Sequence, residues 1–116
     1  MVGRFDSEKI VDIETHSARG IKHSVPIWIV VVDGVPYVRS VRGPEGRWYR
    51  ELLARGDGAL VADAKRVPVR ATLDRSPKTI EAVSGALRKK YPRSGQSLAS
   101  MLRDDVLDTT VRLEPL

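Results

Sequence analysis

Residues 25–52, VPIWIVVVDGVPYVRSVRGPEGRWYREL, contain two strand-like segments joined by a tight turn and followed by a loop and a helix-like segment. The first segment, 25–32, is rich in β-branched residues and predicts a largely buried strand. Asp33-Gly34 predicts a two-residue hairpin turn, because both central residues of such a turn need positive φ. In the return strand, 35–41, Pro36 has no N–H to donate and must lie at a strand start or an unpaired edge. The stretch therefore predicts an antiparallel hairpin.

A helix is expected directly after this hairpin. Pro44 suits its first turn and Gly56 can end it. Two i,i+4 pairs within it, Trp48 with Leu52 and Tyr49 with Leu53, give one broad apolar face. Four arginines gather where the strand gives way to the helix: Arg39, Arg42, Arg47 and Arg50. A ligand with negative charge is one explanation for that cluster.

Hairpins and helices are interspersed along the rest of the chain. The predicted elements are a short helix at 6–12, a strand at 12–17, a second hairpin at 58–63 and 66–73, a helix from Ser76-Pro77 to Pro92, a third helix around Leu98, Met101 and Leu102, and a last strand at 109–115. This order favours an antiparallel sheet or small barrel with packed helices over a doubly wound parallel sheet. A chain of 116 residues with 41% hydrophobic residues suits a single domain spanning 1–116.

Composition limits the possible partners and location. Twenty basic and fifteen acidic residues give a net charge of +5, which favours an anionic partner. No apolar run reaches the length of a membrane span, and the N-terminal stretch lacks the apolar centre of a signal peptide. With no cysteine there is no disulfide framework or thiolate chemistry. We therefore expect a cytoplasmic protein that does not contact membranes.

Several kinds of catalytic site find no support in the sequence. There is no G-x-G-x-x-G, no Walker loop and no nucleophile elbow. His16 and His23 are the only histidines, whereas a catalytic metal site usually needs three protein ligands. No base is placed beside Ser24 or Ser40 by spacing, and the acidic residues are scattered over turns. We therefore predict no metal site and assign no catalytic residue.

Anion binding is the function that remains. A helix that opens at 43–45 leaves its first backbone N–H groups unpaired and carries a partial positive charge. Arg42 precedes that end and Arg47 lies in or near its first turn, so together they form a candidate phosphate seat. A second basic turn, Arg19 and Lys22 around Gly20, precedes the central strand and could hold the same ligand. The alternative is that these are solvated side chains, with Glu51 paired to Arg47 or Arg55.

Two tryptophans and one glycine-rich loop also allow more than one interpretation. Trp28 and Trp48 suit a core or an interface, and either could also stack on a planar ring. Gly43-Pro44-Glu45-Gly46 matches a G-x-x-G loop of the kind that clamps nucleotides in one class of RNA-binding domain. That loop joins two helices, whereas this one follows a strand.

The order of these features resembles the split β-barrel superfamily that binds flavins and deazaflavins. More narrowly, the chain is similar to a family of small bacterial proteins of unknown function allied to the deazaflavin-dependent nitroreductases. The shared elements are the basic turn Arg19–Lys22, Val25-Pro26, Asp33-Gly34, Ser40, the turn Gly43–Gly46, Trp48-Tyr49 and the tail KKYP…SMLRDDVLDTTVRLEP at 89–92 and 100–115.

The resemblance implies an α+β fold, a small six-stranded split barrel with peripheral helices, that forms a homodimer with cofactor bound at the subunit junction. It implies FMN or a deazaflavin as cofactor and oxidoreductase activity of the nitroreductase kind. The residues it points to for cofactor binding are Arg19, Lys22, Pro26, Trp28, Ser40, Arg42, Gly43, Arg47 and Trp48. The alternative is a catalytically silent module for a phosphorylated ligand or nucleic acid. Two local basic clusters, without a broad basic stripe, argue against nucleic acid.

Overall fold

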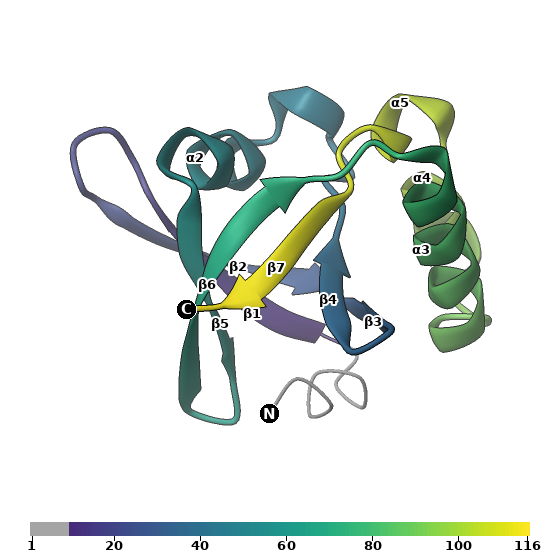
Figure 1. The fold of residues 1–116 in the computed structure, drawn as a ribbon, viewed down its shortest axis with the longest axis horizontal. Helices are drawn as coiled ribbons and strands as arrows, with labels where there is room; N and C mark the ends of the chain where they lie inside the picture. Colours follow the sequence, from purple (N-terminus) through teal and green to yellow (C-terminus); the bar gives the residue numbers. More distant parts are fainter. Residues whose placement is uncertain (1–9) are drawn as a thin grey trace.

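The computed structural model describes residues 10–116, which form one curled antiparallel sheet with helices at one end and along one side (Figure 1). The strands are β1 (Ile10–His16), β2 (Lys22–Trp28), β3 (Val30–Val32), β4 (Val35–Val38), β5 (Asp57–Ala62), β6 (Lys65–Leu73) and β7 (Val111–Pro115), and the helices are the 3₁₀ turn η1 (Gly43–Glu45), α2 (Arg47–Arg55), α3 (Pro77–Lys90), α4 (Gly95–Met101) and α5 (Asp104–Leu107). The sheet order is β2-β1-β5-β6-β7-β4-β3, and every pairing is antiparallel. The α+β class and the antiparallel sheet are therefore confirmed.

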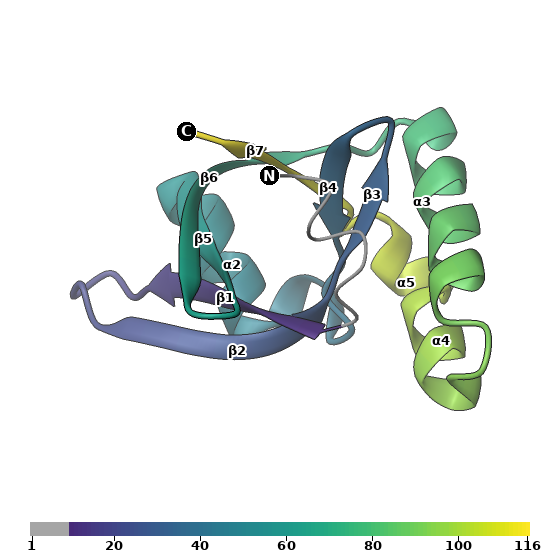
Figure 2. The ribbon, with the colours of Figure 1, turned by 90° about the horizontal axis from the view of Figure 1, so that it is seen from below.

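The sheet curls until its two halves face each other (Figure 2). β5, β1 and β2 form one wall, β4 and β3 form the opposite wall, and β6 and β7 join them. Helix α2 closes one end of this half-barrel, and α3 lies outside it along β3 (Figures 1 and 2). Within residues 10–116, no helix is long and apolar enough to cross a membrane.

The strand count differs from the expected six, because the predicted strand at 25–32 is broken at Ile29 into β2 and β3. Both backbone polar groups of Ile29 bind side chains instead of a neighbouring strand. Its N–H donates to the Tyr91 hydroxyl at 3.2 Å, and its carbonyl accepts from that hydroxyl at 3.0 Å and from Lys90 Nζ at 2.6 Å. A residue whose backbone is bound in this way leaves the ladder, so the sheet has seven strands.

Both predicted hairpins are confirmed. Asp33 and Gly34 have φ of 51° and 79°, as their tight turn requires, and Val32 pairs with Val35 across it. The ladder between β4 and β7 pairs Tyr37 and Val38, so Pro36 lies beyond it and no N–H is missed. The return strand ends at Val38, earlier than expected.

Two helix predictions need correction. The helix expected at 6–12 lies outside the described residues up to position 9, and from Ile10 onward the chain is β1. Val11 and Ile13 alternate with Asp12 and are 2% and 0% exposed, so period-two burial overrides the helical pattern. The helix expected from Pro44 is two pieces, because the extended backbone of Gly46 separates η1 from α2. Gly56 ends α2 in the left-handed region, as predicted.

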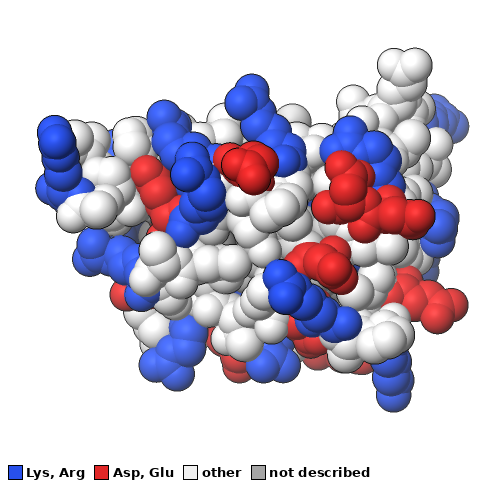
Figure 3. All heavy atoms as spheres, turned by 90° about the horizontal axis from the view of Figure 1, so that it is seen from above, with Lys and Arg blue, Asp and Glu red and all other residues white. Residues whose placement is uncertain are grey.

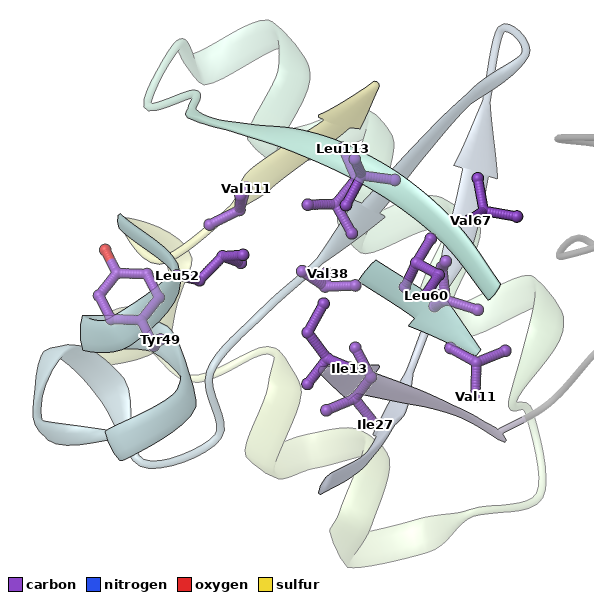
Figure 4. Packing of buried hydrophobic residues seen from close by; sticks show 12 residues of the cluster. Val11, Ile13, Ile27, Val38, Tyr49, Leu52, Leu60, Val67, Val111 and Leu113 are labelled. Carbon is purple, nitrogen blue, oxygen red and sulfur yellow. The ribbon is translucent and has the colours of Figure 1, made fainter. Parts of the chain in front are cut away.

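The main core fills the inside of the half-barrel (Figure 4). Side chains of the strands point into the interior, Leu52 reaches toward them from α2, and Tyr49 of the same helix lies at the edge of the cluster. Leu52 is fully buried, and Trp48 and Leu53 pack partly against the same cluster, which confirms the predicted apolar face. A second cluster, Val30, Tyr37, Val83, Leu87 and Tyr91, attaches α3 to the outside of β3 and β4. Ser76 caps α3 by accepting from the Thr79 N–H.

Candidate functional site

A hollow with a volume of about 730 Å³ lies where β2, the turn after β4, the start of α2 and α4 meet. Six of the predicted site residues line it: Pro26, Trp28, Ser40, Arg42, Arg47 and Trp48. Gly43 belongs to the adjoining turn η1. Segments that are far apart in sequence are thus brought to one place by the curl of the sheet.

Arg19 and Lys22 lie elsewhere. Arg19 is an exposed residue of the β1–β2 connection, which projects away from the body of the molecule (Figures 1 and 2), and Lys22 is the exposed first residue of β2. Neither residue lines this hollow or the smaller one beside α2. The two basic clusters that the sequence offered for one ligand are therefore not brought together within one chain.

The rim of the hollow is cationic and open. Arg42 and Arg47 are both exposed, and neither makes a hydrogen bond or ion pair with another residue of the described chain. Helix α2 begins at Arg47, and no side chain caps its N terminus. Free backbone N–H groups with two exposed guanidinium groups beside them are a suitable seat for a phosphate.

The turn between β4 and α2 is built by Ser40 and two glycines. The Ser40 hydroxyl donates to the Gly43 carbonyl at 2.7 Å, and the Ser40 N–H donates to Thr109 Oγ1 at 3.0 Å. Gly43 has φ of 67°, and a Cβ on Gly46 would collide with the Ser40 hydroxyl. Ser40 is 1% exposed, so its hydroxyl proton is held in the hydrogen bond to Gly43 and fixes the shape of the turn at the rim of the hollow.

Aromatic residues also line the hollow and form an aromatic wall at Trp28. Trp28 stacks on Tyr91 with ring centroids 4.0 Å apart and planes 5° from parallel. Burial raises the pKa of Tyr91 to about 12, although the hydrogen bond to the Ile29 backbone acts in the other direction. Trp48 meets Tyr49 edge-on with centroids 6.3 Å apart. Trp28 is thus held flat by a fixed partner while the residue still lines the hollow.

Arg39 is a site residue that the sequence reasoning did not select. It lines the hollow but is only 2% exposed. Nε donates to Thr110 Oγ1 at 2.8 Å, Nη1 to Ser84 Oγ at 2.9 Å and to the Met101 carbonyl at 3.1 Å, and Nη2 to the Ile80 carbonyl at 2.8 Å. Burial, and then the nearby charge of Arg88, lowers the pKa of Arg39 to about 10. The available signal was one charged residue inside the otherwise apolar strand segment VPYVRSV.

Arg50 faces a different, smaller hollow on the other side of α2, which it shares with Arg47 and Arg55. Glu51 forms no ion pair with Arg47 or Arg55, although the charge of Arg47 helps to lower the pKa of Glu51; its hydrogen bonds go to the hairpin of β1 and β2. It accepts from Thr15 Oγ1 at 2.8 Å and lies 3.0 Å from His23 Nδ1. Thr15 and His23 are paired across that hairpin, so one carboxylate reaches both. Arg55 pairs with Asp57 at 3.1 Å.

Positive and negative side chains are interspersed on the face seen from above in Figure 3. Several basic side chains there have acidic neighbours, and no continuous basic stripe crosses this face. A charge pattern of this kind suits a local anion site better than an extended polyanion track.

The comparison with family models identifies the chain's relatives. Residues 2–113 match the family described as "Uncharacterized protein conserved in bacteria (DUF2255)". The chain belongs to this family. No curated protein matches it at a significant level.

Solved structures show the same fold at low sequence identity. A conserved hypothetical protein from Mycobacterium tuberculosis has a TM-score of 0.75 and 15% identity, over 98% of this chain and 77% of that one. A candidate pyridoxamine 5'-phosphate oxidase from Listeria innocua has a TM-score of 0.70 and 10% identity, over 98% and 89%. An F420-H2 dependent reductase has a TM-score of 0.68 and 19% identity, over 92% and 95%. The DUF2255 chain therefore has the split-barrel fold of FMN-binding-like proteins.

Proposed function

We propose that the hollow binds a phosphorylated flavin or deazaflavin and that the protein is an oxidoreductase of the nitroreductase kind. The observation that carries the proposal is the meeting, around one hollow, of an open cationic rim and an aromatic wall: Arg42 and Arg47 at the uncapped start of α2, and Trp28 stacked on Tyr91. A cofactor with a flat ring and a terminal phosphate matches both parts. The F420-H2 dependent reductase among the structural relatives is consistent with this class of cofactor.

The residues of the hollow fit such a group in size and chemistry. A volume of about 730 Å³ lies in the range of sites that enclose small ligands. The rim would hold the phosphate through Arg42, Arg47 and the first N–H groups of α2, and the strand Val25–Trp28 would lie along the ring. When bound, the cofactor supplies the two-electron chemistry that the protein's own side chains lack.

A homodimer would explain Arg19 and Lys22. β2 is an edge strand of the sheet, and the exposed apolar residues Ile21 and Val41 lie in the adjoining connections, 56% and 40% exposed. A second copy packed along that edge would cover these residues and could bring its Arg19 and Lys22 toward the hollow. Light scattering is expected to show a dimer, and a particle of 12.9 kDa at micromolar concentrations would count against it.

The direct experiment is to add FMN and a deazaflavin separately to the purified protein and follow cofactor absorbance and fluorescence. Quenching of Trp28 and Trp48 fluorescence gives an independent signal, because both residues line the hollow. Saturable binding of either cofactor supports the proposal, and turnover with a nitroaromatic acceptor would establish an enzyme. The lack of cysteine favours a cytoplasmic setting for this activity.

A catalytically silent binding module remains the second candidate. It is favoured by the absence of any acid–base or nucleophilic constellation among the residues that line the hollow, where the titratable side chains are three arginines. The same titration separates the two candidates, since binding without turnover would identify the module.

A further inference from the structure

Arg39 is a buried cation without a counter-charge. Its four acceptors are two hydroxyls and two backbone carbonyls, all of them neutral. No carboxylate of the described chain forms an ion pair with it, and the charge that acts on its pKa, after burial, is that of Arg88, another cation. Buried charges in proteins are normally paired, because an isolated one is costly to remove from water.

The position of Arg39 shows where the missing charge could come from. It lies against the hollow, three residues before the rim residue Arg42. The surrounding walls come from β2 and α4 and are apolar or uncharged, including Trp28 and Met101. Since no carboxylate within residues 10–116 compensates the Arg39 charge, an anion that enters the hollow can do so at short range.

The hydrogen bonds of Arg39 restrict the chemistry of that anion. Four of its five N–H donors are already used, so it cannot form the two-pronged pair with which arginine holds a phosphate. A phosphate would also have to lose its water to reach a residue that is 2% exposed, while Arg42 and Arg47 offer it an exposed seat. Arg39 is better matched to a weakly hydrated charge spread over a conjugated ring.

We propose that Arg39 is a specificity-determining residue that makes the hollow select the anionic form of a planar conjugated ring, lying against the aromatic wall while its phosphate stays at the rim. The inference rests on the proposed function and adds the charge state of the ring that is bound. Arg39 acts through its field and at most one hydrogen bond, so a merely structural role would not give it any preference between ring charge states.

The test compares oxidised FMN, whose ring is neutral, with dithionite-reduced FMN at a mildly alkaline pH at which its ring is ionised. Wild-type protein is expected to bind reduced FMN at least about tenfold more tightly, which raises the midpoint potential of bound FMN by about 30 mV for this two-electron couple. Added salt is expected to weaken the binding of both forms, because it screens the exposed rim. The ratio of their two affinities is expected to stay nearly unchanged, because the buried charge of Arg39 is screened little.

Two variants of Arg39 and a control at the rim test whether Arg39 causes the preference for reduced FMN. R39K keeps the charge and is expected to keep the preference, whereas R39M is expected to bind both forms equally. R42A, at the rim, is expected to weaken both forms by the same factor. If R39M does not fold, the wild-type ratio and R39K decide the matter. Equal binding of both forms by wild type, or a preference retained by R39M, overturns this inference alone. Failure of both forms to bind overturns it together with the proposed function.

Discussion

An arginine lies at the rim of the hollow, Arg42, and another lies at its buried floor, Arg39, but the two differ in their surroundings. Arg42 is exposed and its side chain makes no hydrogen bond or ion pair with the rest of the described chain, whereas Arg39, three residues earlier, is 2% exposed and bonded to four groups. Those four groups lie on α3, on α4 and on Thr110, the residue before β7, so Arg39 joins the helical side of the molecule to the sheet. The comparison shows that burial and partners, and not residue type, decide whether an arginine stabilises the fold or remains available for a ligand.

The largest expected effect is on folding, from the change R39M. It removes four charge-assisted hydrogen bonds and leaves two hydroxyls and two carbonyls without their donor. We expect a loss of about 3 kcal/mol or more in the free energy of unfolding, measured by urea denaturation. R42A is expected to change it by less than about 0.5 kcal/mol. Similar losses in the two variants would remove the distinction between floor and rim.

The next effect is on cofactor binding by the rim. Each of R42A and R47A is expected to weaken FMN binding by about tenfold to a hundredfold, since a charge-assisted hydrogen bond contributes roughly 1.5–3 kcal/mol. R50A is the matched control, because Arg50 is on the same helix but faces the other hollow. Equal small losses from all three changes would indicate diffuse electrostatics and no phosphate seat.

A third effect concerns the aromatic wall behind Trp28. In Y91F the buried N–H and carbonyl of Ile29 lose the hydroxyl that bonds both, which costs about 1–3 kcal/mol of stability in thermal or urea unfolding. Y37F is the control, since Tyr37 is similarly buried and its hydroxyl has no hydrogen bond to the described residues. If Y91F and Y37F lose the same stability, the hydroxyl does not hold the strand break.

The smallest effect is a pH dependence at the rim helix. Burial alone would raise the pKa of Glu51, but hydrogen bonds from Thr15 and His23, together with the charges of His23 and Arg47, outweigh it and hold the pKa below its ordinary value of 4.5. The ionised carboxylate therefore stabilises the fold fully above that value, and the contribution disappears as the pH falls through the lowered pKa.

E51Q tests this by removing the titrating group. Its melting temperature is expected to fall less steeply than that of wild type across the acid range, while E45Q, at an exposed carboxylate, keeps the wild-type slope. A slope for E51Q that matches wild type would show that Glu51 does not anchor α2 to the hairpin in a pH-dependent way.

Much of the fold was predictable because its signals are local. The Asp33-Gly34 turn, the alternation in both hairpins and the Ser76 cap depend on neighbouring residues, and the structure confirms them. The break at Ile29 was not predictable, because it is made by Tyr91, 62 positions away. No local pattern at 25–32 contains that information.

The candidate site shows the same limit. Sequence order indicated that Trp28, Arg42 and Arg47 belong to one site, and the hollow brings them together. The sequence did not show that Arg39 is buried while the neighbouring arginines are exposed, because the groups that accept its hydrogen bonds are 41 to 71 positions away. The sequence also suggested that Arg19 and Lys22 contact the same ligand as Arg42 and Arg47, but within one chain they do not line the same hollow.

The central claim is that the rim holds a phosphate, and the most direct measurement is the ratio of dissociation constants for riboflavin and FMN, which differ only by that group. Wild type is expected to prefer FMN by about tenfold to a hundredfold, and the R42A/R47A double variant is expected to bind the two with nearly equal affinity. Equal affinities in wild type, or a preference for FMN that survives in the double variant, would contradict the account.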